Sequence, residues 1–359
     1  MEQAHGFGDA ALSQPAKAAD GSRAISFFIF NTDVSLYAYA SDGEDPDGAG
    51  VADRLDAALL ACRDRCLFFE RALSRTRGDS DISRAHAASP APVEVASETA
   101  DLVRRSLGYC ARSRGLFDIT MGTVTRLWDF HRGVVPSRLA LARALPHVGC
   151  ERIVLGERAG ADGAARPTLA ITDPQTVLDL GGTAKGYIAD DLGRLLGEHG
   201  VARFVLNLGG NVLVRGGRPA DPAARPAVRA GEPWRIGIEN PLDPRHSRAI
   251  VAVTDGSVVT SGVHERRFTR GGVTYWHILD PRTGMPAASD VASATIVAAR
   301  SMDCDGYSTT AFMLGAQAAI DFVEGLEGVE AVIITDRDEV LWTSGLEDRL
   351  SLVPTLPRL

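Results

Sequence analysis

Strand-like and helix-like segments alternate irregularly along this chain of 359 residues, and this order constrains its fold more than any other feature. Apolar residues recur every three or four positions from Val51 to Leu73, which predicts an amphipathic helix of about six turns. Gly78 and the polar stretch Asp79–Ser83 are expected to end that region. Because helices do not follow strands one by one, the order favours an α/β (α+β) fold, a mixed sheet with interleaved helices.

Short apolar runs between turn residues predict the strands of this sheet. The predicted strands are Ile25–Phe30, Val34–Ala40, Arg152–Leu155, Leu169–Ile171, Phe204–Leu208, Asn211–Arg215, Trp234–Glu239, Ala249–Thr254, Ser257–Thr260, Tyr275–Leu279, Ala292–Ala298, Ala331–Thr335 and Val340–Thr343. The other predicted helices are Ser97–Arg114 (with Ser97 as N-cap), a helix that begins at Pro136-Ser137, Ala184–His199, Asp303–Leu314 and Ala316–Leu326.

Charge and composition restrict the function and the domain organisation. The chain has 38 Lys+Arg and 46 Asp+Glu, a net charge of −8, which argues against a nucleic-acid partner. Residues 1–24 carry several charges and no long apolar run, so we expect a disordered N-terminal tail, no membrane span and a cytoplasmic protein. A single folded region over residues 25–350, possibly of two interlocked subdomains, and a tail at 351–359 complete the prediction.

A glycine pair marks the first candidate site. An apolar run beginning at Leu178 leads into Gly181-Gly182, and Lys185 follows at the expected start of a helix. Glycines let backbone approach a ligand closely, and a helix N-terminus with a lysine favours a phosphate. An ordinary strand-to-helix turn with a surface lysine explains the same residues equally well. Dinucleotide-binding, P-loop and hydrolase-elbow motifs are absent from the sequence.

A carboxylate and a hydroxyl mark the second candidate site. Asp305 and Thr309 lie four residues apart, on one face of the predicted helix. Such hard oxygen donors suit Mg²⁺. The alternative is an acidic residue in the first turn of a helix, where the helix dipole stabilises it.

A histidine near a polar turn marks the third candidate site. Strand alternation would place His277 on one face and Ile278 and Asp280 on the other. The turn that begins at Asp280 contains Arg282, which could contact a phosphate. His277 could equally be a structural histidine.

Taken together and in order, these segments resemble the successive motifs of the FAD:protein FMN transferases, the ApbE-like flavin transferase family. The resemblance extends over about residues 26 to 345 and implies a two-part α/β architecture with a flavin cleft. The matching segments are Gly115–Thr120, Leu178–Tyr187, Asn207–Asn211, Thr260–Gly262, His277–Gly284 and Asp305–Thr309.

The resemblance also implies roles for individual residues. Mg²⁺ would be held by the backbone carbonyl of Ala184 and by the side chains of Asp305 and Thr309. The residues implied for FAD are Phe117, Asp118, Asp179, Lys185 and, near the reacting diphosphate, Ile278. His277 is the first candidate for the base that takes the acceptor's proton, and Asp280 the second.

The implied reaction is the Mg²⁺-dependent transfer of FMN from FAD to a threonine or serine hydroxyl of an acceptor protein, with release of AMP. Two alternatives use the same residues: an FAD pyrophosphatase that gives FMN and AMP, and a non-catalytic FAD-binding module. The sequence departs from the family pattern at two places. Val263 and His264 precede Glu265-Arg266, and Ala85-His86 stands where the family often has an apolar residue and Asn.

Overall fold

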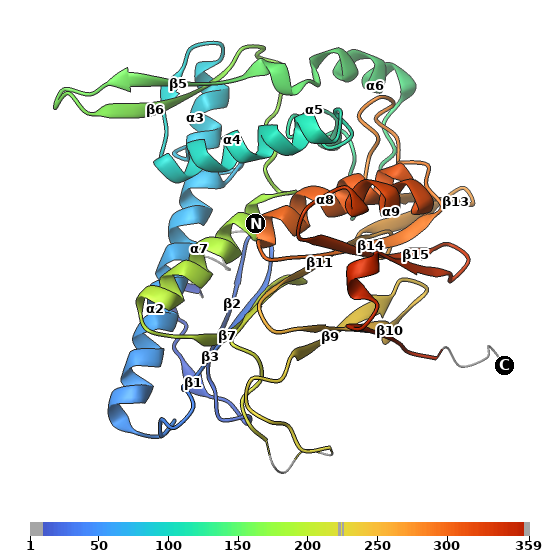
Figure 1. Cartoon of the computed structure of the whole chain (residues 1–359). Helices are drawn as coiled ribbons and strands as arrows, with labels where there is room; N and C mark the ends of the chain where they lie inside the picture. The colour runs from blue at the N-terminus through green and yellow to red at the C-terminus, as the bar shows by residue number, and fades with distance from the viewer. Residues whose placement is uncertain (1–9, 222–223, 225, 355–359) are drawn as a thin grey trace.

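A nine-stranded sheet crosses the whole molecule (Figure 1). The computed structural model describes residues 10–221, 224 and 226–354. All neighbouring strands of this sheet pair antiparallel. In spatial order they are β1 (Ala16–Lys17), β2 (Arg23–Ile29), β3 (Thr32–Tyr39), β7 (Arg203–Leu208), β8 (Asn211–Arg215), β11 (Gly256–Gly262), β14 (Val291–Ala298), β15 (Val329–Thr335) and β16 (Val340–Trp342).

Helices pack against this sheet and against one another. Helix α8 contacts β11 and β14, and α7 contacts both α2 and α8 (Figure 1). Eleven of the 14 residues of α8 are buried, because sheet and helices enclose it on several sides. The helices are α2 (Ala49–Leu73), α3 (Asp81–Ala88), α4 (Ser97–Arg112), α5 (Gly122–Thr125), α6 (Arg138–Ala144), α7 (Ala184–Glu198), α8 (Ser301–Leu314) and α9 (Ala316–Glu324), with short 3₁₀ turns η1 (Leu145–His147), η2 (Cys150–Arg152) and η3 (Ser344–Leu346).

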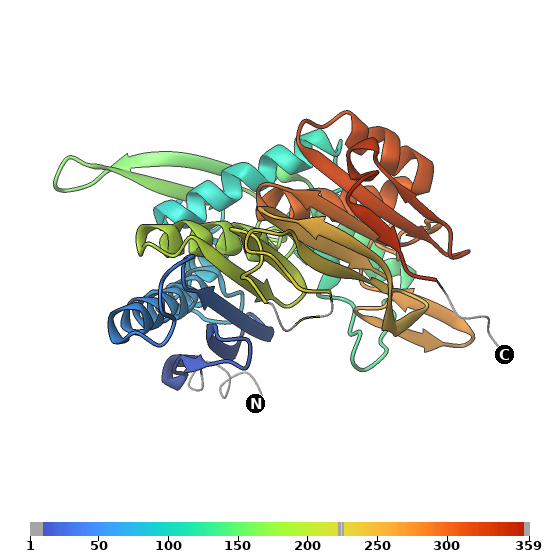
Figure 2. The ribbon, with the colours of Figure 1, turned by 60° about the horizontal axis from the view of Figure 1, so that its bottom comes forward.

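Among the described residues, three small sheets complete the fold. The hairpin of β5 and β6 extends away from the body of the molecule (Figures 1 and 2). The three small sheets comprise β4 (Val93–Glu94) with β6 (Ala165–Ile171) and β5 (Ile153–Ala159), β12 (Arg267–Arg270) with β13 (Val273–Trp276), and β17 (Leu350–Leu352) with β10 (Asp243–Val253) and β9 (Trp234–Asn240). In the described part of the chain, no helix is long and apolar enough to cross a membrane.

The structure confirms the mixed α/β fold with interleaved helices. The long helix predicted from Val51 is α2, and its buried positions are the apolar residues of the three- and four-residue spacing. The chain orders earlier than predicted, because Ala16 pairs with Ala24 and the hydroxyl of Tyr39 donates to Asp20 at 2.7 Å. The prediction of a disordered tail over residues 1–24 is therefore wrong from residue 16 on. Residues 1–9 lie outside the described part of the chain.

Other boundaries also differ from the prediction. Ser351 pairs with Ile250 in β17, so the expected C-terminal tail begins with a strand. Ser80 caps α3 by accepting a hydrogen bond from the Ser83 amide at 3.0 Å, where a loop was expected. Ser97 is the first residue of α4 and not its N-cap. Strand β13 ends at Trp276, so His277 is not part of a strand.

Candidate active site

The first turn of α7 lies directly against the start of α8. A Cβ at Gly186 would stand 2.5 Å from the carbonyl oxygen of Ser301 and 2.7 Å from the Cα of Met302. One turn further along α7, the Asp190 carboxylate accepts hydrogen bonds from the amides of these two residues at 2.7 and 3.0 Å. Only glycine allows this approach, which brings the start of α7 to the metal-ligand candidates on α8.

Asp305 is a buried carboxylate at this contact. It is 6% exposed, and it accepts hydrogen bonds from the Gly186 amide at 2.6 Å and from the Asn211 side-chain amide at 3.2 Å. Burial raises the pKa of Asp305, and the nearby charge of Lys185 acts in the opposite direction. Both hydrogen-bond donors are neutral, so a cation bound here would stabilise the ionised carboxylate.

The remaining residues predicted for a metal lie in the same region. Thr309 is half-buried on α8, one turn after Asp305, and Ala184 and Lys185 are the first two residues of α7. A carboxylate, a hydroxyl and a backbone carbonyl are oxygen donors of the type that Mg²⁺ binds. The donor set around Asp305 therefore fits this ion.

A second close approach fixes the other side of α8. A Cβ at Gly306 would stand 2.6 Å from the ring of Tyr109 on α4. The Tyr109 hydroxyl donates to Asp303 at 2.5 Å, and Arg300 also binds this carboxylate, at 2.8 Å. Gly186 thus lets α7 pack closely against α8, and Gly306 lets α4 do the same from another side. These two contacts fix the position of Asp305 on α8.

The Phe117 segment lies beside the Gly-Gly turn. A Cβ at Gly182 would stand 2.8 Å from the ring of Phe117, and the Asp179 amide donates to the Ile119 carbonyl at 2.7 Å. The Asp179 carboxylate forms an ion pair with Arg75 at 3.0 Å. Two segments about 60 residues apart in the sequence, both implicated in FAD binding by the resemblance, are therefore adjacent.

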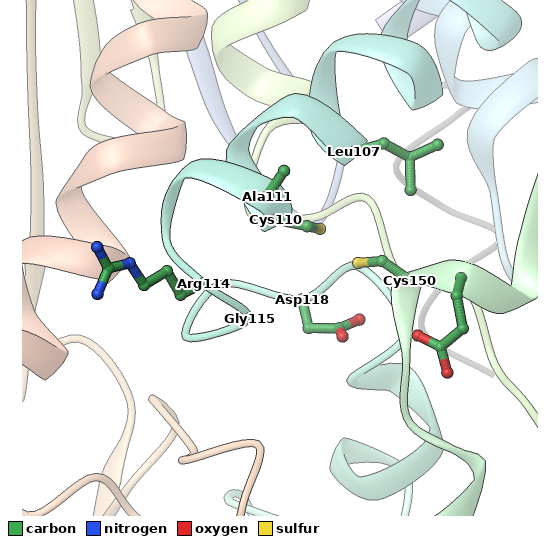
Figure 3. Close-up of a pocket in the computed structure, with 8 residues that line it drawn as sticks. Leu107, Cys110, Ala111, Arg114, Gly115, Asp118 and Cys150 are labelled. Carbon is green, nitrogen blue, oxygen red and sulfur yellow. The ribbon is translucent and has the colours of Figure 1, made fainter.

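Asp118 faces a different set of side chains. Its carboxylate accepts hydrogen bonds from the amide and the hydroxyl of Thr120 at 2.7 and 2.6 Å. It also lines a hollow with Cys110 and Cys150, and Figure 3 shows the carboxylate and the two sulfur atoms close together.

His277 belongs to a group of charged residues near the start of α7. Its amide donates to the Arg266 carbonyl at 3.1 Å, and its Nε2 lies 3.7 Å from the Glu265 carboxylate. Burial first, and then the charges of Arg266 and Lys185, together lower the pKa of His277 to about 4. Burial raises the pKa of Glu265, while Lys185 acts against this. The imidazole is therefore neutral at physiological pH.

Asp280 is bound within its own turn. Arg282 donates to its two carboxylate oxygens at 2.9 and 2.6 Å and lowers its pKa, which is the largest effect on this group. Ile278 is buried, and its carbonyl accepts from the Ala287 amide at 2.9 Å.

The sequence prediction did not assign a role to two residues that the fold brings to this site. Asn211 donates to Asp305, and Glu265 lies near both Lys185 and His277. Asn211 belongs to one of the segments that carry the resemblance, and Glu265 follows another. This position was the only signal in the sequence that could have identified them. The partner of Asn211 is Asp305 and a partner of Glu265 is Lys185, and each pair is more than 60 residues apart in the sequence. Only His277, the other neighbour of Glu265, is close to it in the sequence.

The comparisons with known sequences agree on one family. Residues 30–333 match the ApbE family. A protein of Treponema pallidum (strain Nichols) named FAD:protein FMN transferase is 36% identical over 288 residues, which is 79% of this chain and 78% of the relative. A protein of the same name from Salmonella typhimurium is 30% identical over 273 residues, 74% of this chain and 73% of the relative.

Solved structures show the same fold. The ApbE protein of Thermotoga maritima superposes with a TM-score of 0.75 at 24% identity and covers 91% of this chain and 99% of its own. The flavin transferase ApbE of Vibrio cholerae superposes with a TM-score of 0.73 at 23% identity, with the same coverage of 91% and 99%. The matched span and the identity to the Treponema protein establish that this chain belongs to the ApbE family.

Proposed function

We propose that this chain transfers FMN from FAD to a threonine or serine hydroxyl of an acceptor protein and releases AMP. The observation that carries the proposal is the contact between the first turn of α7 and Asp305, where a glycine amide donates to a buried carboxylate at 2.6 Å. At this contact, a helix N-terminus and the charge of Lys185 lie near the carboxylate of Asp305, which supports the proposal of an oxygen-donor site there. Such a site suits a diphosphate bound with a divalent cation.

The proposed step is a displacement at phosphorus. The acceptor hydroxyl oxygen forms a bond to the phosphorus on the FMN side of FAD, and the bond from that phosphorus to the bridging oxygen breaks. AMP leaves with the bridging oxygen, and the hydroxyl proton passes to a base. A reaction of this kind depends mainly on positioning and on neutralising charge.

The residues of this chain divide these tasks between them. Lys185 and Arg266 bring positive charge to the region where the diphosphate would lie. Asp305, Thr309 and the carbonyl of Ala184 would hold Mg²⁺, which neutralises phosphate charge when bound. Phe117 and Asp179 are proposed to bind FAD, because their segments meet at the Gly-Gly turn. The side chain of Asp118, which the resemblance also implies for FAD, faces Cys110 and Cys150 instead.

His277 is the better candidate for the base. Its imidazole is neutral at pH 7, with a pKa of about 4, and can accept a proton, although the low pKa makes it a weak base. A bound phosphate dianion would raise that pKa by favouring the charged form. The carboxylate of Asp280 is bound by Arg282 on both oxygens, which disfavours it for the same role.

The test is incubation of the purified chain with FAD and Mg²⁺, with and without a protein that carries a flavinylation-type threonine segment. Intact mass of the acceptor and release of AMP are measured together, and EDTA is the control. FMN mass on the acceptor that disappears with EDTA is the expected result.

Other outcomes identify other functions. AMP and free FMN without labelling of any acceptor would indicate a pyrophosphatase. Bound FAD without AMP under all conditions would indicate a binding module and contradict the proposal. A cytoplasmic location stays a prediction, and fractionation of cells that produce the chain checks it.

A further inference from the structure

A cluster of two cysteines and one aspartate lies at the C-terminal end of α4. Cys110 is in the last turn of this helix and 4% exposed, and Cys150 is the first residue of η2. The two sulfur atoms and a carboxylate oxygen of Asp118 all lie within 4.8 Å of one another. The cluster lines a hollow that opens to solvent, shown in Figure 3.

The geometry points to a second metal site in this chain, formed by Cys110, Cys150 and Asp118 and suited to a thiophilic divalent ion such as Zn²⁺. Two thiolates and a carboxylate are typical zinc ligands, and a water molecule from the open side of the hollow can complete a tetrahedron. Thiolates bound at ~2.3 Å to a tetrahedral ion stand roughly 3.8 Å apart. Small side-chain movements therefore close the observed cluster around an ion.

The surroundings orient the three ligands. Thr120 donates twice to the Asp118 carboxylate, and its hydroxyl accepts from the Gly149 amide at 2.8 Å, next to Cys150. Hydrogen bonds of this kind fix the direction of a ligating carboxylate. Because α4 ends beside Cys110, the helix dipole also favours a cation here. Figure 3 shows the Arg114 side chain extending away from the sulfur atoms.

A metal explains the cluster better than a redox switch between the same cysteines. A disulfide would use the two sulfur atoms but would give Asp118 no role. The form of cysteine that binds a metal is the thiolate. A metal ion supplies the opposite charge and displaces the protons, so that binding releases two protons to solvent.

The test is a Co²⁺ titration of the full chain after reduction and removal of metals, in the presence of excess Mg²⁺ to occupy an oxygen-donor site. Thiolate-to-cobalt charge-transfer absorption in the near ultraviolet reports sulfur ligation specifically. We expect one Co²⁺ per chain, release of two protons, and loss of the band when Zn²⁺ is added. Cys110→Ala and Cys150→Ala should abolish the band, and Asp118→Asn should raise the Kd by more than about tenfold.

Cys62→Ala is the matched control. Cys62 is also buried but lies on α2 in a different part of the core, so its removal should leave the cobalt spectrum unchanged. Where a variant does not fold, the wild-type chain gives the answer through alkylation. Zn²⁺ should protect Cys150, the more exposed of the two cysteines, from iodoacetamide, as located by mass spectrometry. Absence of the band, a band that survives both cysteine variants, or a Cys110–Cys150 disulfide formed without any metal binding would each overturn the proposal.

Discussion

His86 accepts a hydrogen bond at its Nε2 from the backbone amide of Leu178, at 2.9 Å. This contact joins α3 to the strand-like segment that leads into the Gly-Gly turn. His86 also belongs to one of the two places at which the sequence departs from the family pattern. Since the amide is a donor, Nε2 carries no proton, and the imidazole must be neutral for the contact to exist.

This contact predicts a pH-dependent stability. Burial, then the charges of Arg126 and Arg75, lower the pKa of His86 below its usual 6.5. The group's contribution to the free energy of unfolding is therefore complete above pH 6.5 and decreases as the pH falls toward the lowered value. Urea unfolding at a series of pH values measures this decrease.

His86→Gln should remove this part of the pH dependence, because its amide oxygen can take the position of Nε2 and accept the same hydrogen bond without titrating. His86→Ala should cost about 1–3 kcal/mol at pH 7.5, since it leaves a buried amide unsatisfied. His131→Gln, at an exposed position, is the control and should change neither quantity. Identical pH profiles for the wild type and His86→Gln would contradict the prediction.

Asp305→Asn should separate metal binding from folding. The substitution keeps the side-chain volume, but its NH2 group must face either the Gly186 amide or the Asn211 side-chain amide, so stability without metal should fall by about 1–3 kcal/mol while the chain stays folded. Mg²⁺-dependent AMP release should fall by at least about 100-fold, as for loss of a key electrostatic group. Both are measured on the same preparation, by thermal unfolding and by nucleotide analysis.

Asp303→Asn, two residues earlier on α8, is the control for this experiment. Asp303 binds Tyr109 and Arg300, so this variant should lose stability but keep its dependence on Mg²⁺. Full AMP release by Asp305→Asn would remove Asp305 from the metal site.

Gly186→Ala should weaken both the fold and FAD binding. The new Cβ would meet backbone atoms of α8 at 2.5 and 2.7 Å, so α7 must shift, at a cost of about 1–3 kcal/mol. Gly197→Ala on the same helix is the matched control, because no other atom lies within 4 Å of its Cβ. That variant should be up to about 1 kcal/mol more stable. Equal stability of the two variants, from urea unfolding, would refute the close-approach argument.

Lys185→Ala should weaken FAD binding by roughly 10- to 100-fold, the range for a hydrogen bond to a charged group. The loss should be smaller at high salt, because screening already weakens the interaction in the wild type. Fluorescence titration with FAD measures both effects. Lys17→Ala is the control, since Lys17 is exposed and pairs with Asp47 in the N-terminal region. Unchanged affinity in Lys185→Ala would make this lysine a simple surface residue.

Local sequence patterns predicted most of the elements of this fold. Helix α2 followed from the spacing of its apolar residues, and the hairpin of β2 and β3 followed from two apolar runs around a short turn. Helix α3 was missed because it is eight residues long and begins in a polar stretch, so that its start depends on the Ser80 cap. The pairing of Ala16–Lys17 was missed because two residues carry no periodicity.

The candidate site was predictable only through the order of its motifs. Spacing within α8 placed Asp305 and Thr309 one turn apart, but nothing local to either residue indicates that Gly186 would donate to Asp305. That contact depends on glycines that let helices approach, which is a property of tertiary packing. The cluster of Cys110, Asp118 and Cys150 was missed for the same reason, since Cys150 arrives from a separate segment.

The pairing of β3 with β7 has a consequence for synthesis of this protein. Strand β3 pairs with β2 on one side and with β7 on the other, where Ser35 lies opposite Asn207. Strand β7 therefore emerges from the ribosome long after β2 and β3. Until then the N-terminal hairpin presents an open strand edge, and such edges can pair with other chains. Contacts so distant in sequence also form slowly. Newly made N-terminal segments of this protein should therefore be clients of chaperones that shield them during translation.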